Sequence, residues 1–421
     1  MGANQAMKNC VVEPKSIHSG DFHSVFHFST SPRVEGSNNQ TLHPMLVLPL
    51  ICSSSWPWRA ELCNLAVLTL QPVTAQSVLS SVRRCGRLLP LHLLVVLAAG
   101  ALGQESAQVP TAVPNVSSPA PWMRDPEKVH DPSTIILTHG VRRFFCTGPG
   151  VLLMREDAQG KWMPEGRLFA QGQYPAWHEQ LVPGNRGYLW APDVIQIGEK
   201  FFVYYSVSTF GKNTSAIGLA VGAGLDPSSP QWQWEDRGPV FTSGRQDRFN
   251  AIDPAIFRDS SDGALWMAFG SFWDGIHLVE LDPSTGLRRD PKDKAVRLAS
   301  APEIEAPFLH QRDGYYYLFL NWGKCCRGVN STYEIRVGRS RSVAGPYIDR
   351  SGTNLREAGG SLVLASEDRW IGPGHASIFS HDGHEWLVHH YYDRELGGRS
   401  RLRMVPLTWD PEGWPFVTSE P

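Results

Sequence analysis

The sequence has few cysteines outside its first hundred residues and almost no net charge. Of the seven cysteines in 421 residues, only Cys146, Cys325 and Cys326 lie beyond residue 100, so that part of the chain offers no disulfide framework. The formal net charge is −2. This balance gives no electrostatic reason to expect nucleic acid or an anionic membrane as a partner.

Long apolar runs are also scarce. The run from Leu88 to Leu102 spans 15 residues, fewer than the roughly 20 that a membrane-spanning helix needs. It follows the basic segment 83–87 and ends at the small residues of 101–103, which is the pattern of a secretory signal peptide. Because such a signal normally starts near the initiating Met, we interpret residues 1 to about 80 as an over-extended gene model. A signal anchor behind a cytoplasmic tail is the alternative.

We therefore predict a secreted, extracellular protein with no stable membrane association. Residues 1–103 form an N-terminal extension that ends in the signal-like segment at about 83–103, and residues 104–124 form a flexible lead-in rich in Pro, Ser, Ala and Val. Residues 125–421 hold the folded domain. The N-glycosylation triplets at Asn115, Asn213 and Asn330 fit secretion, although such triplets also occur by chance.

What the chain does have is one short pattern, repeated five times. Each copy opens with a polar or aromatic residue, followed by Pro or Ala and a short apolar run. The openings are Asp131-Pro-Ser-Thr-Ile, Trp190-Ala-Pro-Asp-Val, Asp253-Pro-Ala-Ile-Phe, Glu305-Ala-Pro-Phe-Leu and His375-Ala-Ser-Ile-Phe. They are 59, 63, 52 and 70 residues apart. A period in this range, built from short strands, is typical of a β-propeller.

Each opening is followed by two further strands in phase. The second strand is rich in aromatic and β-branched residues, as in 201–205 and 315–319, and it follows a turn such as Asp313-Gly314. A third strand then appears, for example at 216–221. Three phased strands in each repeat leave little room for helices. We predict an all-β fold, a single five-bladed β-propeller with its active site at the central channel.

Three of the five opening residues are acidic, and the opening residue of each repeat is expected to face the channel. Asp253 and Glu305 come from neighbouring blades, where one carboxyl raises the pKa of the other, so one of them can stay protonated as a general acid. Asp131 lies two blades from both and can remain ionised as a general base. This arrangement fits an inverting glycoside hydrolase, whose carboxyl groups lie roughly 6.5–9.5 Å apart. An Asp-Pro pair is also a common turn element, so any one of these acids alone would more often be structural.

The remaining opening residues are Trp190 and His375. Trp190 has no titratable group, so we expect it to stack on a sugar, with blade packing as the alternative. His375 follows Gly372-Pro-Gly and can be a metal ligand, directly or through water, or a hydrogen-bond partner of a carboxylate. One histidine does not define a metal site by itself, so both roles stay open.

Several longer motifs follow one another in a fixed order. They are His130-Asp-Pro-Ser, Leu189-Trp-Ala-Pro-Asp, Asn250-Ala-Ile-Asp-Pro-Ala, Phe269-Gly-Ser-Phe-Trp-Asp-Gly, Ile304-Glu-Ala-Pro-Phe, Cys325-Cys-Arg-Gly-Val-Asn-Ser-Thr-Tyr and Gly372-Pro-Gly-His. Together they resemble the endo-1,5-α-L-arabinanases of glycoside hydrolase family 43. The resemblance runs from about residue 125 to beyond residue 405, and the motif that begins at Cys325 is its most specific element.

The resemblance implies hydrolysis of internal α-1,5-arabinofuranosidic bonds in arabinan, including the side chains of pectin, with inversion. It places the general base on Asp131 and the general acid on Glu305, while Asp253 tunes the pKa of the acid and orients the sugar. It implies a central ion near His375, often calcium held largely through water, and no organic cofactor. We also expect a monomer. The sugar subsites it implies include Asn250, Ile252, Gly270, Ser271, Phe272 and Trp273.

Two other functions remain open from the sequence. A catalytically silent propeller could bind carbohydrate or protein, but such a binder has no reason to keep Asp131, Asp253 and Glu305 converging in one pocket. A β-xylosidase or α-L-arabinofuranosidase of the same family would differ by having one end of its groove blocked. Loop shape decides between endo and exo action, and the sequence does not reveal loop shape.

Overall fold

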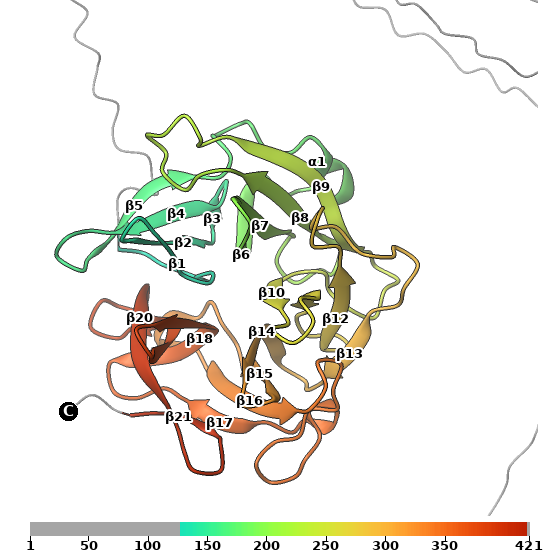
Figure 1. The fold of residues 1–421 in the computed structure, drawn as a ribbon, viewed down its shortest axis with the longest axis vertical. Coiled ribbons are helices and arrows are strands. Elements are labelled where there is room, and N and C mark those ends of the chain that lie inside the picture. Colours follow the sequence, from blue (N-terminus) through green and yellow to red (C-terminus); the bar gives the residue numbers. More distant parts are fainter. Residues whose placement is uncertain (1–126, 419–421) are drawn as a thin grey trace, which may run out of the picture. The chain divides into compact units, whose positions relative to one another are not determined.

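The computed structural model describes residues 127–418, so the predicted signal-like segment, the extension before it and the lead-in lie outside the described residues. Within 127–418 the strands form five antiparallel sheets around a central channel (Figure 1). The predicted all-β, five-bladed propeller is therefore confirmed. Within the same residues, no helix is both long enough and apolar enough to cross a membrane.

The first two blades lie next to each other in the ring and are built from residues 136–243. The first sheet has the order β1-β2-β4-β5, and the second has the order β3-β6-β7-β8-β9. Their strands are β1 (Ile136–Thr138), β2 (Val141–Cys146), β3 (Gly148–Pro149), β4 (Leu152–Glu156), β5 (Trp162–Arg167), β6 (Tyr188–Ile197), β7 (Lys200–Val207), β8 (Ser215–Gly222) and β9 (Trp234–Ser243).

The other three blades each follow the simple order of the chain, so that each strand pairs with the next one in sequence. Their strands are β10 (Ala255–Arg258), β11 (Leu265–Phe269), β12 (Ile276–Leu281), β13 (Val296–Ala299), β14 (Ile304–Arg312), β15 (Tyr315–Trp322), β16 (Glu334–Ser340), β17 (Ser361–Leu364), β18 (Trp370–His381), β19 (His384–Asp393), β20 (Arg399–Trp409) and β21 (Pro415–Val417). The short helices are α1 (Trp177–Leu181), η2 (Gly328–Asn330) and η3 (Leu355–Glu357).

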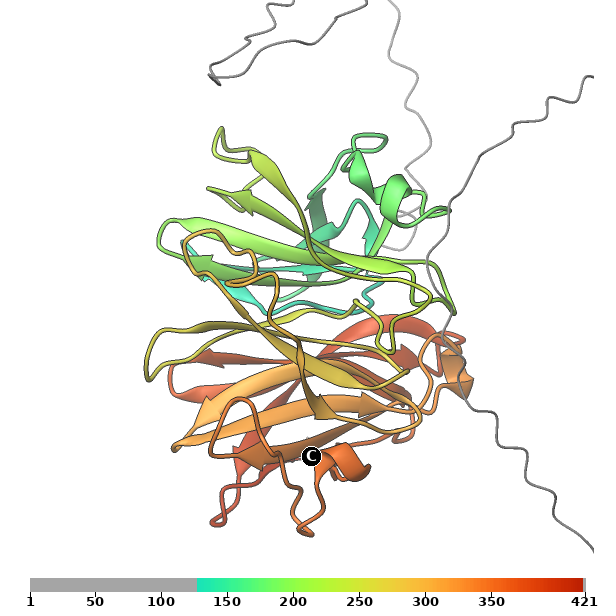
Figure 2. The same ribbon diagram turned by 90° about the vertical axis from the view of Figure 1, so that its right-hand side faces the viewer.

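The blades radiate from the channel. Figure 1 shows β6, β10 and β14 near the centre, while β9, β13 and β17 lie toward the outside, and Figure 2 shows the blades stacked side by side in the perpendicular view. Because the first strand of each blade is the innermost, the residues at its start meet at the channel. The sequence therefore brings residues that are far apart in the chain to one place.

A left-handed residue marks the start of every blade. These residues are Asp131, Ala191, Asp253, Ala306 and His375, with φ between 41° and 58°. The structure thus corrects the alignment of the repeats: Trp190 and Glu305 lie one residue before this position, whereas the sequence comparison put them in phase with Asp131. Register shifts follow both residues in β6 and β14. Such bulges re-aim side chains, so Trp190 and Glu305 still reach the pocket.

Packing between neighbouring blades forms the core. Five clusters of buried side chains lie between the sheets, and the cluster that joins the last blade to the first includes Phe144, Met154, Phe379 and Val388. Among the described residues no strand is shared between these two blades. Burial of this apolar surface therefore closes the ring.

One buried carboxylate links three blades and serves the fold. The two oxygens of Asp193 accept hydrogen bonds from the backbone N–H groups of Thr134, at 3.0 Å, and Ile256, at 2.7 Å. Thr134 belongs to the first blade, Asp193 to the second and Ile256 to the third. Because burial raises the pKa of Asp193 while both oxygens are occupied, we assign it a structural role.

The predicted glycosylation triplets differ in accessibility. Asn213 is buried, and its side-chain amide donates hydrogen bonds to the carbonyl oxygens of Asp247 and Phe249, at 2.9 and 3.2 Å. A glycan on this amide would require the fold to open locally. Asn330 is exposed at the end of η2, and Asn115 lies outside the described residues. Asn330 is therefore the accessible triplet within 127–418.

Candidate active site

One large pocket opens where the first strands of the blades converge. Its volume is about 1310 Å³, and Asp131, Trp190, Asp253, Glu305 and His375 all line it. The structure therefore brings together all five residues that the repeat pattern singled out. Their catalytic roles stay predictions, as does the separation of the Asp131 and Glu305 carboxyl groups in the inverting range.

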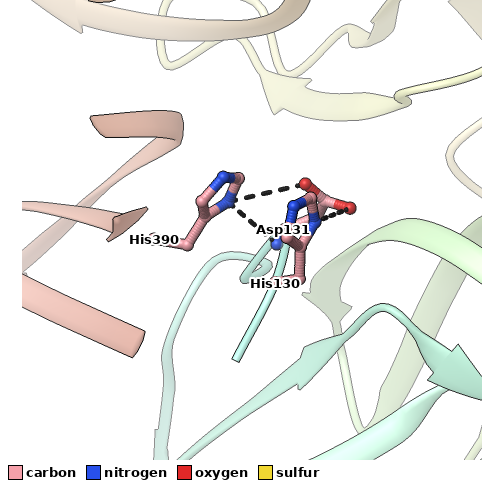
Figure 3. A group of neighbouring side chains, drawn as sticks. All are labelled: His130, Asp131 and His390. Atoms are coloured by element: carbon pink, nitrogen blue, oxygen red, sulfur yellow. Dashed lines mark hydrogen bonds and ion pairs between the residues drawn. The ribbon is translucent and has the colours of Figure 1, made fainter. Parts of the chain in front are cut away.

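Asp131 lies among three histidines and a threonine. One of its carboxylate oxygens, Oδ2, accepts a hydrogen bond from Thr147 Oγ1 at 2.6 Å and lies 2.8 Å from His130 Nδ1. The other oxygen, Oδ1, lies 3.6 Å from His375 Nδ1 and 3.5 Å from His390 Nδ1. Figure 3 shows His390 approaching Asp131 from β19, on the opposite side of the junction between the last and first blades.

The charge of His130 decides the protonation state of Asp131. Burial alone would raise the pKa of this carboxyl, but the charge and hydrogen bond of His130, with help from His375 and His390, hold it well below its usual range. Burial alone would lower the pKa of His130, but Asp131 raises it to about 10. The two groups therefore form an imidazolium–carboxylate pair. Asp131 stays ionised at neutral pH, as a general base requires.

His375 and His390 are neutral imidazoles beside this carboxylate. Burial lowers the pKa of both, and His390 Nδ1 accepts a hydrogen bond from the backbone N–H of Asp131 at 3.1 Å. His130, Asp131 and His390 form a group of possible metal ligands, but His130 as an imidazolium has no free ring nitrogen to bind a metal. His375 lies outside that group, with its Nδ1 3.6 Å from Asp131 Oδ1. A neutral imidazole beside a carboxylate can bind a cation whose remaining ligands are waters, and the ion near His375 stays a prediction.

Glu305 and Asp253 line the same pocket from the fourth and third blades, where their partners are neutral. Glu305 Oε2 accepts a hydrogen bond from Ser271 Oγ at 2.6 Å, and its Oε1 accepts one from the hydroxyl of Tyr333. Asp253 Oδ2 accepts a weaker bond from the backbone N–H of Ala306 at 3.3 Å. No histidine, lysine or arginine of the described residues forms an ion pair with either carboxyl.

Both of these carboxyls are held toward the protonated form. Burial raises the pKa of Glu305, and the charge of Asp131 adds to this effect, while the bonds from Ser271 and Tyr333 oppose it. Burial also raises the pKa of Asp253, together with the charge of Glu305. The pocket therefore places a carboxyl whose pKa is lowered and two carboxyls whose pKa values are raised around one space. Shifts in opposite directions are what a base and an acid for hydrolysis of a glycosidic bond require.

The residues assigned to sugar subsites lie in the same pocket, with one exception. Asn250, Ile252, Ser271, Phe272 and Trp273 all line it. Gly270 does not. Its backbone N–H donates to the carbonyl oxygen of Ile252 at 2.9 Å, and a Cβ atom at Gly270 would lie 2.3 Å from the carbonyl oxygen of Gly275. Gly270 therefore supports the lining residues by letting two backbone segments approach closely.

Several pocket residues escaped the sequence analysis. His130 and His390 surround Asp131, Tyr333 bonds Glu305, and Tyr188 and Phe210 lie at the mouth. Two signals existed: His130 directly precedes Asp131, the predicted base, and Tyr333 closes the motif that begins at Cys325.

The paired cysteines also line the pocket. Cys325 and Cys326 are free thiols whose Sγ atoms lie 2.6 Å apart, and Cys326 Sγ lies 3.8 Å from His130 Nε2. The backbone N–H of Cys326 donates to the hydroxyl of Tyr392 at 2.7 Å, and this hydroxyl lies 2.8 Å from His130 Nε2. The segment thus holds His130 in place beside Asp131.

The fold is a five-bladed propeller, and its pocket brings together carboxyls whose pKa values are shifted in opposite directions. The chain matches the model of glycosyl hydrolases family 43 over residues 123–415. It belongs to that family, which confirms the resemblance noted in the sequence and makes the protein a glycoside hydrolase.

Named relatives and a solved structure are similar to the chain over the same region. An extracellular exo-α-(1→5)-L-arabinofuranosidase of Cellvibrio japonicus is 42% identical over 69% of this chain and 86% of its own length. An extracellular endo-α-(1→5)-L-arabinanase of Bacillus subtilis is 38% identical over 70% of this chain and 89% of its own. The structure of an α-L-arabinanase of Cellvibrio cellulosa complexed with arabinohexaose has a TM-score of 0.66 and 40% identity, covering 70% of this chain and 96% of that one.

Proposed function

We propose that this protein hydrolyses internal α-1,5 bonds of arabinan by an inverting mechanism. The observation that carries the proposal is that Asp131 and Glu305 line one pocket, where the imidazolium of His130, 2.8 Å from Asp131, lowers the pKa of Asp131 while burial raises that of Glu305. The names of the relatives support the substrate, since they include an endo-α-(1→5)-L-arabinanase and an arabinanase complexed with arabinohexaose. A catalytically silent propeller would have no need for two buried carboxyls whose pKa values are shifted in opposite directions.

The reaction needs one proton to leave a water molecule and one to reach the leaving sugar. As the oxygen of a water attacks the anomeric carbon, the carboxylate of Asp131 takes its proton. The bond from that carbon to the bridging oxygen breaks, and Glu305 gives its proton to this oxygen. The products are two shorter chains, and the new hydroxyl lies on the face opposite to the bond that was broken.

Asp253 acts on Glu305 and on the sugar in this proposal. The pKa of Asp253 is raised by burial and by the charge of Glu305. Two neighbouring carboxyls cannot both ionise easily, so the pair retains a proton for the leaving group. When protonated, Asp253 can also donate a hydrogen bond to a sugar hydroxyl.

The mouth of the pocket suits a chain of sugars better than a single one. Phe210 is 79% exposed, and Trp273 and Tyr188 are each 46% exposed, although all three line the pocket. Flat apolar faces in this setting can stack on successive sugar rings. The volume exceeds the roughly 300–1,000 Å³ typical of small-ligand pockets. Both features favour cleavage within a chain.

A central cation, such as calcium, is part of this proposal. His375 would hold it, largely through water, and its charge would help to keep Asp131 ionised. Activity measured against pH before and after chelation, and in His375→Ala, tests this. We expect chelation and the His375→Ala substitution to shift the same limb of the pH–activity profile, the acidic limb that reports ionisation of Asp131. Unchanged profiles, together with no metal in elemental analysis, would leave His375 as a hydrogen-bonding residue.

We also propose that the protein is secreted and acts as a monomer on cell-wall arabinan. Two relatives are named as extracellular enzymes, which supports the first point. Recovery of the cleaved chain from the medium of expressing cells, with its N-terminus sequenced, tests both the export and the position of the cleavage.

Product analysis on linear 1,5-arabinan tests the proposed activity directly. We expect a ladder of oligosaccharides at early times, with Asp131→Asn as the inactive control. The exo-acting relative makes release from one chain end the second candidate, and a single small product from the first minutes onward would favour it. No hydrolysis of linear arabinan would overturn the proposal.

A further inference from the structure

The charged side chains that line the pocket are sorted by depth. The carboxyl groups lie on the floor, and all are buried or nearly so: Asp131, which is paired with the imidazolium of His130, Asp253 and Glu305. The charged side chains of the mouth are exposed or half-exposed, and all are basic: Lys128, Lys212, Lys324, Arg327 and Arg399. The chain as a whole has 39 basic and 41 acidic residues. The single sign of charge at the mouth is therefore a local feature.

Three of the basic residues lie on one side of the mouth, and we call them the basic rim: Lys128, Arg327 and Arg399. The first and third are brought together where the ring closes. The backbone N–H of Val129, next to Lys128, donates to the carbonyl oxygen of Ser400, next to Arg399, at 3.4 Å. The two cations therefore flank one backbone contact.

Arg327 is joined to the other two residues of the basic rim by a close backbone contact between the segments at Gly328 and Gly398. A Cβ atom placed on Gly398 would lie 2.7 Å from the backbone nitrogen of Val329, so the turn before Arg399 touches the segment after Arg327. Three segments that are distant in sequence thus form a continuous edge of the pocket. Each contributes one cation to it.

The basic rim has no acidic partner in the described part of the chain. Lys324, beside it, forms an ion pair with Glu303 at 2.8 Å, but none of the three rim residues has such a pair among residues 127–418. The floor does not need their charge either, because Asp131 is already paired with His130 at 2.8 Å. Three like charges thus face solvent beside a sugar-binding pocket, and an anionic ligand would relieve their mutual repulsion.

We propose that the basic rim binds carboxylate groups of an acidic polysaccharide to which the arabinan chain is attached. This inference rests on the proposed hydrolysis of arabinan and names its natural substrate more closely: an arabinan side chain still joined to a backbone that contains uronic acids. The neutral side chain enters the pocket while the charged backbone lies along Lys128, Arg327 and Arg399. Guanidinium groups suit this contact because they bind carboxylates in a bidentate manner.

The test compares two forms of one polymer. One is arabinan attached to its uronate-containing backbone, and the other is the same polymer after chemical reduction of its carboxyl groups to alcohols. We expect kcat/KM to be about threefold to tenfold higher on the acidic form, the size that a few exposed ion pairs can supply. The preference should disappear in about 0.5 M NaCl, because salt screens exposed charges.

Two triple variants locate the effect. Lys128→Gln/Arg327→Gln/Arg399→Gln should lose the preference for the acidic form while keeping the activity on linear arabinan. Lys200→Gln/Lys292→Gln/Lys294→Gln removes the same charge at exposed positions outside the pocket and should keep the preference. Equal kcat/KM on the two polymers in the unmodified enzyme would overturn the proposal. So would an equal loss of preference in both triple variants.

A binding measurement separates this inference from the proposed function. Calorimetric titration with a short oligomer of galacturonic acid should give binding that weakens at least about fivefold in the rim variant and is unchanged in the control variant. Hydrolysis of linear arabinan, which carries no charge, tests the proposed function alone. Hydrolysis of linear arabinan without oligouronate binding would overturn only the proposed role of the basic rim. Oligouronate binding without hydrolysis would overturn only the proposed activity.

Discussion

Asp131 and Glu305 come from different blades, and their surroundings shift the pKa of the same functional group in opposite directions. Burial alone would raise the pKa of both carboxyls. Asp131 has the imidazolium of His130 at 2.8 Å, whereas Glu305 has only the hydroxyls of Ser271 and Tyr333. The pKa of Asp131 is lowered and that of Glu305 is raised. The comparison teaches that the nearest full charge, rather than burial, determines which carboxyl has the lowered pKa of a base and which has the raised pKa of an acid.

The largest expected effect comes from removing the base. Asp131→Asn cannot accept a proton, so we expect kcat to fall about 10²- to 10⁴-fold. The loss should be similar on arabinan and on an aryl arabinoside, because both reactions need an activated water. Initial rates on the two substrates check this. Retention of more than a tenth of the activity on either one would assign the base elsewhere.

Removing the acid should affect the two substrates unequally. Glu305→Gln keeps the shape of the side chain but cannot donate a proton, so we expect a loss on arabinan comparable to that of the base variant. An aryl arabinoside with a good leaving group needs less help and should lose much less. Binding of arabino-oligosaccharides should persist. If both substrates suffered alike, Glu305 would not be the general acid.

A smaller effect should follow from removing the charge beside the base. His130→Gln deletes the imidazolium that lowers the pKa of Asp131. With less stabilisation of the ionised form, this pKa rises by roughly one to three units. The acidic limb of the kcat profile should therefore move to higher pH, while the alkaline limb stays in place. His381→Gln, at an exposed histidine outside the pocket, is the matched control. A uniform loss at every pH would mean that His130 only supports the fold.

The sequence predicted Asp131 and Glu305 as the two carboxyls of this comparison, but not the neighbouring residues that give them different pKa values. Asp131 and Asp253 occupy the same position in their blades and Glu305 lies one residue before it, so their period is visible along the chain. His390 reaches Asp131 from β19, which is 259 residues away, and only closure of the ring brings the two together. Partners of this kind have no pattern of spacing, so single-sequence reasoning cannot find them.

The same limit applies to residues that look alike in sequence. Asp193 and Asp253 both sit near a proline at the start of an inner strand, yet Asp193 accepts backbone bonds from two other blades and Asp253 lines the pocket. Asp193 lies two residues after the left-handed Ala191 and at the register shift in β6, whereas Asp253 is itself the left-handed residue of its blade. A bulge of one residue changes the face on which a side chain lies, and the repeat alone did not reveal it.

The smallest expected effect comes from removing one hydrogen bond to Glu305, the acid of this comparison. Ser271 donates a hydrogen bond to Glu305 at 2.6 Å, which favours the ionised carboxylate and lowers its pKa. Ser271→Ala removes this bond, so the pKa of Glu305 should rise, by about one unit for a bond to a charged group. The alkaline limb of kcat/KM should then move to higher pH and the acidic limb should not move. A shift of the acidic limb instead would show that the two sides are coupled, and that Asp131 and Glu305 titrate as one system rather than as a separate base and acid.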